Sequence, residues 1–133
     1  MTQLHRYLSR LHDTLLSRQE ITIEFLEIFD PSNYANQSSE FYARLRFADG
    51  STLEIVEKLT IEQFLIRKTR YVYHFQTADN QLIFRYDNAP HHPEISTHPH
   101  HKHAGDDQII AATPPDLSDV LREIDNYLYA QQR

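Results

Sequence analysis

The spacing of apolar residues changes along the chain, and this change constrains the fold more than any other feature of the sequence. A period of three to four residues is typical of an amphipathic helix, and strict alternation is typical of a half-buried strand. The helical period occurs at both ends of the chain. Near the N-terminus its apolar residues are Leu4, Leu8, Leu11 and Leu15. Near the C-terminus Asp116 is the predicted N-cap, and the apolar residues that follow are Leu117, Val120, Leu121, Ile124 and Leu128. Between these two segments, alternation prevails. The pattern predicts an α+β fold in which an antiparallel meander of about five strands carries both terminal helices on one face.

Two hairpins are expected in the middle of the chain, and the first has a register that the side chains decide. A three-residue loop with Gly50 in the left-handed conformation pairs Leu45 with Leu53 and Arg44 with Glu54. A two-residue loop would mix apolar and charged side chains on each face. The longer, bulged loop is therefore the prediction.

The second hairpin is expected to turn at 78–81. A two-residue loop there pairs His74 with Arg85 and puts Asp87 on the same face, opposite Val72. The other face then carries the aromatic residues expected in the core, namely Tyr71, Tyr73, Phe75, Phe84 and Tyr86. Because helices must cover one face of the sheet, these aromatics are interpreted as core, and the polar trio as an exposed cross-strand cluster or part of a site.

Other segments are less determined. A strand is predicted at Ile21–Ile28, with Ile21, Ile23 and Phe25 on one face, and a turn-forming cluster at 30–33 precedes a polar connection at 34–39. The segment 60–68 has helical spacing but also fits an irregular crossover. A long loop rich in proline and histidine is expected from Asn88 to about Pro115.

Length and composition bound the class of protein. The chain has 133 residues and no cysteine, which fits one domain over 1–133 and excludes disulfides, thiolate metal sites and cysteine nucleophiles. No apolar run approaches the roughly 18 residues of a membrane span, so a small, soluble, cytoplasmic protein without a membrane partner is predicted.

Charge is unevenly distributed. The net charge of −6 disfavours nucleic-acid binding when taken alone. Residues 66–105, however, contain five Lys or Arg against three Asp or Glu, together with seven of the nine histidines. The basic run at 67–70 begins this window and could steer a phosphate backbone, although such runs are usually solvated edges. The sequence thus allows an acidic body with one cationic face.

The histidine-rich loop is where chemistry is expected, and three interpretations of it stay open. The first is a solvated loop without a specific role. The second is a metal site for zinc, copper or nickel, in which Asp87 or Glu94 completes a set drawn from His98, His100, His101 and His103. The third is acid–base catalysis, in which two imidazoles act as base and acid in metal-independent RNA cleavage and Arg85 or Lys102 holds the phosphate.

The stretches Tyr86–Glu94 and Pro99–His103 resemble the central motif of TumE-type toxins, which belong to bacterial toxin–antitoxin modules. The similarity extends back through 71–76 and 82–85 and forward to the last helix, so that it covers roughly 67–130. It implies a growth-inhibiting toxin that a co-encoded antitoxin neutralises, often one with a helix-turn-helix domain. His98 departs from the family pattern, which has an apolar or aromatic residue before Pro99.

The motif and the local positive charge together favour a type II toxin that acts as a small endoribonuclease without a required cofactor, and a nuclease assisted by a divalent metal such as zinc stays open as an alternative. The expected acid–base residues are His91, His92, His100, His101 and His103. Asp87 would orient an imidazole, and the phosphate would be bound by Arg85 and Lys102, with His74 and Arg70 nearby. The rival interpretation is a non-catalytic module that binds zinc, nickel or a protein through the loop at 88–105. The sequence leaves the oligomeric state open, a homodimer included.

Overall fold

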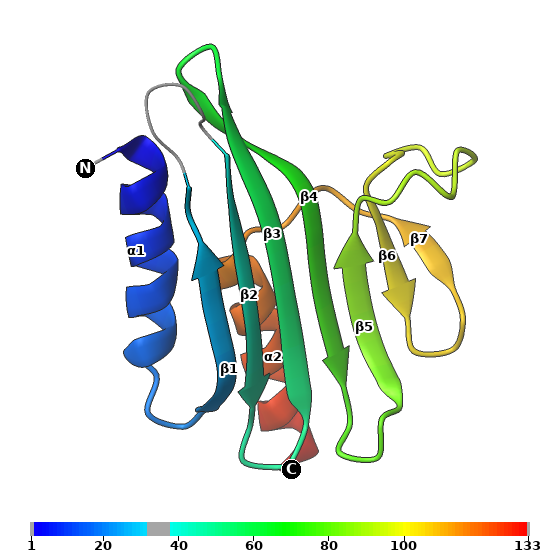
Figure 1. Ribbon diagram of the computed structural model, residues 1–133. Coiled ribbons are helices and arrows are strands. Elements are labelled where there is room, and N and C mark those ends of the chain that lie inside the picture. The colour runs from blue at the N-terminus through cyan, green and yellow to red at the C-terminus, as the bar shows by residue number, and fades with distance from the viewer. Residues whose placement is uncertain (1, 32–37, 133) are drawn as a thin grey trace.

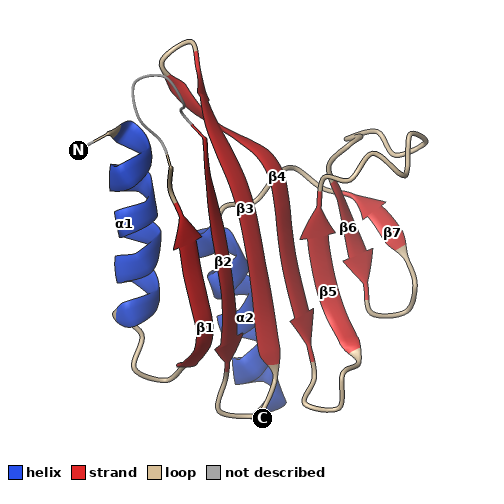
Figure 2. Cartoon of the chain, viewed as in Figure 1, coloured by secondary structure: helices blue, strands red, loops and turns tan. Residues whose placement is uncertain are grey.

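The computed structural model describes residues 2–31 and 38–132 and contains two helices and one sheet (Figure 1). The helices are α1 (Gln3–Leu16) and α2 (Leu117–Gln131). The strands are β1 (Thr22–Phe29), β2 (Ser38–Arg46), β3 (Thr52–Glu62), β4 (Leu65–Gln76), β5 (Leu82–Asp87), β6 (His101–Ala104) and β7 (Ile109–Ala111). They form one antiparallel sheet in chain order, from β1 to β7 (Figure 2). The α+β class is confirmed, with seven strands in place of about five.

Both helices cover the same face of the sheet and bury the predicted apolar stripes against it. Thr2 caps α1 and Asp116 caps α2, each by accepting a hydrogen bond from a backbone N–H of the first turn. Leu15 of α1 and Ile124 of α2 are fully buried in one core with the inward-facing strand residues. In Figure 1, α1 lies beside β1 and α2 lies behind the sheet. Within the part of the chain described, neither helix combines the length and apolar character needed to cross a membrane.

The predicted hairpin registers are confirmed. Leu45 pairs with Leu53 and Arg44 with Glu54, and Gly50 has a φ of 85°, which suits the bulged turn. In the second hairpin, His74 pairs with Arg85 as predicted.

The turn of that second hairpin differs from the prediction. A bulge between Phe75 and Gln76 makes the loop one residue longer, so that the Thr77 N–H donates to the carbonyl of Gln81. Asn80 takes the left-handed conformation that this turn requires, with a φ of 67°.

Three segments depart from the expectations. Residues 60–68 form neither a helix nor a crossover but the tip of the β3–β4 hairpin. The loop after Asn88 is not free of regular structure, because it contains the short strands β6 and β7. A bulge between Ile23 and Phe25 in β1 turns the Phe25 side chain out of the core. Phe25 is consequently 48% exposed. The turn expected at 30–33 and the connection at 34–39 fall mainly on 32–37, outside the described residues.

Candidate functional site

The helix-free face of β4, β5 and β6 carries a polar cluster that the strand registers assemble. Arg85 of β5 lies between His74 of β4 and His103 of β6, and Asp87 pairs with His101. Because side chains alternate along a strand, residues 85 and 87 and residues 101 and 103 share this face. The cluster therefore lies on the opposite side of the sheet from α1 and α2.

Asp87 is the centre of the cluster and is only 3% exposed. Its Oδ1 accepts a hydrogen bond from the Ala89 N–H at 2.9 Å, and its Oδ2 accepts one from Arg85 Nε at 2.9 Å. Burial acts to raise the pKa of Asp87, but these two hydrogen bonds and the charges of His101 and Arg85 outweigh it and hold the pKa below its ordinary value. Asp87 is thus an anchored carboxylate.

His101 is buried beside Asp87, and its ring orientation is fixed from both sides. Its Nδ1 lies 2.9 Å from the carbonyl oxygen of Pro99, which can only accept, so Nδ1 carries the hydrogen of this bond. The other nitrogen, Nε2, lies 3.1 Å from Asp87 Oδ1 and 3.1 Å from His103 Nε2. His101 therefore turns Nε2 toward the centre of the cluster.

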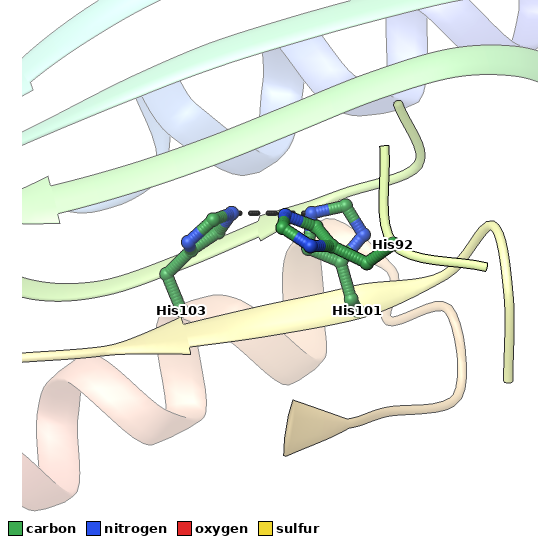
Figure 3. A group of neighbouring side chains, drawn as sticks. All are labelled: His92, His101 and His103. Carbon is green, nitrogen blue, oxygen red and sulfur yellow. Dashed lines mark hydrogen bonds between the residues drawn. The ribbon is translucent and has the colours of Figure 1, made fainter. Parts of the chain in front are cut away.

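His92 brings a third imidazole to this point from the loop that follows β5. Figure 3 shows the side chains of His101 and His103 projecting from the same side of β6, with the His92 ring reaching them from the loop. The His92 ring centroid lies 5.0 Å from that of His101 and 5.8 Å from that of His103. One ring nitrogen from each residue lies within 4.8 Å of the others, so these three form a group that could share a metal ion.

The two outer imidazoles differ from His101 in their access to solvent. The side chains of His92 and His103 are 25% and 26% exposed, against 3% for His101. Burial lowers the pKa of His103 below its ordinary value, and the nearby charges of His101, Arg85 and His92 lower it further against the opposing effect of Asp87. His103 is accordingly shifted toward the neutral form, which can accept a proton or bind a metal.

Two guanidinium groups border the cluster. Arg85 contacts His74 Nδ1 at 3.2 Å, and His74 in turn contacts Gln76 through Nε2 at 3.0 Å, so both ring nitrogens of His74 are occupied. Arg70 Nη1 lies 3.6 Å from Asp87 Oδ1 and donates to Asn88 Oδ1 at 3.0 Å. Both arginine side chains are about one-third exposed, at 34% for Arg85 and 33% for Arg70.

Two other expected site residues lie on the helix-covered side. Lys102 alternates with His101 and His103 along β6, so its side chain points to the helix side. There its Nζ donates to Glu123 of α2 at 2.8 Å. The same ion pair, with Tyr86, raises the pKa of Lys102 although burial opposes the shift. His100 stacks on Tyr71 and its Nδ1 lies 2.9 Å from the Tyr71 hydroxyl oxygen, while burial and the charge of His101 lower its pKa. Neither side chain is part of the cluster.

The remaining loop histidines, His91 and His98, are exposed, and neither belongs to the group of three that converges on one point. The basic run at 67–70 is divided between the two faces of β4. Arg70 reaches the cluster, whereas Lys68 forms an ion pair with buried Glu57 on the helix side.

An open cavity of about 620 Å³ also lies on the helix side, between β4 and the start of α2. His100 and Lys68 line it together with Asp116 and Asp119, so its charge is mixed. Because it lies on the other side of the sheet, this cavity is separate from the polar cluster.

Sequence reasoning missed two sets of polar contacts. Asn88 belongs to the quoted motif, but its role is visible only in the structure: its Oδ1 accepts from the Tyr71 N–H, and its Nδ2 donates to the Thr69 carbonyl, which fixes the start of the loop. Glu57 is fully buried and accepts hydrogen bonds from the hydroxyls of Tyr7 and Tyr73. The signal for Glu57 was a charged residue at an inward-facing position of an alternating strand.

Comparison with known proteins identifies the family. The sequence model of the family described as Toxin TumE matches residues 12–128, which is nearly the whole chain. Comparisons with curated proteins and with solved structures give no significant match. The family match includes the polar cluster together with the sheet that supports it. The chain therefore belongs to the TumE toxin family.

Proposed function

We propose that this toxin is an endoribonuclease whose site is the cluster on the helix-free face, and that a cognate antitoxin, expected to carry a helix-turn-helix domain, neutralises it in the cytoplasm. His92 and His103 form the acid–base pair, and Arg85 and Arg70 bind the phosphate. The observation that carries the proposal is the presence of two partly exposed imidazoles and two partly exposed guanidiniums around one buried carboxylate.

Exposure decides the division of roles among the three imidazoles. A proton-transfer group must reach the substrate within hydrogen-bond distance, directly or through one water. His92 and His103 retain about a quarter of their side-chain surface, whereas His101 retains almost none. His101 and Asp87 therefore act as positioning residues, which hold the two reactive rings and the guanidinium of Arg85 in place.

The charge balance of the cluster favours a phosphate. Among the described residues, the only carboxylate that forms an ion pair with Arg70 or Arg85 is Asp87. Two guanidiniums sharing one carboxylate leave one positive charge uncompensated within this group of three. A guanidinium binds phosphate oxygens through paired N–H donors, and it stabilises the negative charge that develops during transfer at phosphorus.

The reaction assigned to this site is transesterification within the RNA. One imidazole accepts the proton of the ribose 2′-hydroxyl while the 2′-oxygen forms a bond to phosphorus. The bond from phosphorus to the 5′-oxygen breaks, and the second imidazole, protonated at the start, gives its proton to that oxygen. The products are a 2′,3′-cyclic phosphate and a 5′-hydroxyl, and no metal or other cofactor is needed for the balance.

The test uses the purified full-length chain with total RNA, tRNA and DNA, each with and without EDTA. We expect RNA cleavage in EDTA and a loss of at least about 100-fold in His92→Ala and in His103→Ala, since a general acid or base contributes about that much or more. The control is His12→Ala, on the distant helix α1, which should match the wild type. Full activity in both site variants would contradict the proposal. Retained metal without any cleavage would favour the non-catalytic metal-binding module.

A further inference from the structure

We infer that the same cluster is a binding site for one divalent transition-metal ion, such as Zn²⁺, and that the ion inhibits the nuclease. The ligands are His92, His101 and His103, which converge on one point. The Asp87 carboxylate contacts His101 and His103 from outside this group of three and would become the fourth ligand after a shift toward the ion. The metal site follows from geometry alone, whereas the inhibitory effect rests on the proposed function. This set differs from the one that sequence spacing suggested, because His98 and His100 do not belong to it.

Three distances within the cluster are close to those between neighbouring ligand atoms of a tetrahedral zinc site. Zinc binds imidazole nitrogen at about 2.0–2.1 Å and carboxylate oxygen at a similar distance, so neighbouring ligand atoms in a tetrahedron lie about 3.3 Å apart. His101 Nε2 lies 3.1 Å from His103 Nε2 and 3.1 Å from Asp87 Oδ1. His103 Nε2 lies 3.6 Å from Asp87 Oδ2. Small shifts of His101, His103 and Asp87 would bring these atoms to the separation that one zinc ion requires, and His92 offers a ring nitrogen within 4.8 Å of the ligand nitrogens of the other two histidines.

The groups around the ligands also have the arrangement that metal sites use. A histidine that binds a metal through one nitrogen usually donates the other N–H to a carbonyl or carboxylate, which fixes the ring. His101 does this with the Pro99 carbonyl, and His92 Nδ1 lies 3.4 Å from Glu94 Oε1. His101 is therefore held at the nitrogen that would not bind the ion, and the Glu94 carboxylate lies beside the His92 ring.

The carboxylate is fixed in the same manner. Arg85 and the Ala89 N–H hold the Asp87 oxygens at 2.9 Å each. A fixed ligand loses little conformational entropy when the ion binds. Three neutral imidazoles and one carboxylate form a ligand set that suits Zn²⁺, Co²⁺ or Ni²⁺ better than Mg²⁺ or Ca²⁺, which prefer oxygen.

Inhibition follows from the use of the same nitrogen atoms. A nitrogen lone pair that binds a metal can neither accept a proton nor carry one to the leaving oxygen. Coordination of His92 and His103 would thus remove both the base and the acid of the proposed reaction.

The binding test titrates Co²⁺ into EDTA-treated, dialysed protein and follows visible absorption, because four-coordinate Co²⁺ absorbs much more strongly than hydrated Co²⁺. We expect one ion per chain, displacement by Zn²⁺, and affinity lower by more than about 100-fold in His103→Ala and His92→Ala. The matched control is His98→Ala, a histidine of the same loop, which should bind Co²⁺ as the wild type does. No tetrahedral spectrum, or equal weakening by His98→Ala, would overturn the site.

The inhibition test measures RNA cleavage by the wild type before and after one equivalent of Zn²⁺, and again after excess EDTA. We expect loss of cleavage that EDTA reverses, and unchanged or faster cleavage with bound zinc would overturn the inhibitory role. Cleavage in EDTA without any Co²⁺ binding would reject the metal site and leave the nuclease intact. Tight Co²⁺ binding by a protein that cleaves no RNA would reject the nuclease, and with it the inhibition, while the metal site stands.

Discussion

Replacement of Asp87 by asparagine tests whether the buried carboxylate holds the cluster together. The substitution keeps the size of the side chain and removes its negative charge. In the wild type, that charge faces Arg85 at 2.9 Å, His101 at 3.1 Å and Arg70 at 3.6 Å. An amide would place its NH₂ group against either the Arg85 Nε–H or the Ala89 N–H, so at least one contact becomes repulsive.

The size of the effect follows from the two hydrogen bonds that the carboxylate accepts, from Arg85 Nε and from the Ala89 N–H. A hydrogen bond to a charged group contributes about 1.5–3 kcal/mol to stability, against about 0.5–1.5 kcal/mol for a neutral one. The loss is therefore about 1–1.5 kcal/mol for each bond, and Asp87→Asn should lower the free energy of unfolding by about 2–3 kcal/mol. For a domain of this size, that corresponds to a fall in Tm of about 10 °C.

Urea unfolding at neutral pH, followed by circular dichroism with EDTA present, measures this difference without a contribution from bound metal. The control is Asp106→Asn, at an exposed turn between β6 and β7, which should change stability by less than about 0.5 kcal/mol. If Asp87→Asn unfolded within about 0.5 kcal/mol of the wild type, the carboxylate would not be the electrostatic anchor of the cluster.

Four further outcomes are expected. Glu57→Ala should cost about 3–5 kcal/mol in urea unfolding, because it leaves two tyrosine hydroxyls and a lysine without their buried acceptor, and a cost below about 1 kcal/mol would contradict the buried network. Burial and the charge of Asp87 raise the pKa of Tyr71 to about 12, so its contribution to stability is complete below about pH 10 and is lost as the pH rises through 12. Between pH 10 and pH 12 the free energy of unfolding should fall less for Tyr71→Phe than for the wild type. Equal falls would refute the raised pKa of Tyr71. Gly50→Ala should cost about 1–2 kcal/mol in thermal unfolding, since φ is 85° and the new Cβ would lie 3.0 Å from the Ala78 Cβ, and an unchanged Tm would contradict the turn geometry. Asn88→Ala should accelerate amide hydrogen exchange over 88–100, and unaltered exchange would show that the side chain does not fix the loop.

The hairpin registers could be predicted because one face of each strand must be apolar. A slip of one residue would have turned Leu45 and Leu53 to solvent, so that only one pairing satisfied both strands. The same reasoning predicts that His74, Arg85 and Asp87 share one face, and the pairing of β4 with β5 confirms it.

The β3–β4 tip and the last two strands could not be predicted in this way. The tip places Gln63 and Phe64 at positive φ without glycine or asparagine, so the sequence contains no turn signal there. Strands β6 and β7 are only four and three residues long, and histidine and lysine in β6 give no apolar alternation to detect. Their pairing depends on the edge that β5 offers, which is a tertiary effect.

The candidate site was partly predictable, because side chains alternate along a strand. The spacing of two between His101 and His103 indicated a shared side if the segment was extended, and it is extended in β6. The alternation that unites these two histidines also sends His100 and Lys102 to the other side. The choice of His92 over His91 depends on the path of an irregular loop, and no local periodicity encodes that path.

The most direct test of the nuclease assignment is the rate at which the full-length chain cleaves an RNA in EDTA, compared with the same RNA carrying 2′-O-methyl groups. Cleavage of the unmodified strand alone, with 2′,3′-cyclic phosphate ends and dependence on His92 and His103, is the expected result. Equal cleavage of both strands, or activity that requires an added metal ion, would contradict histidine acid–base chemistry at this cluster.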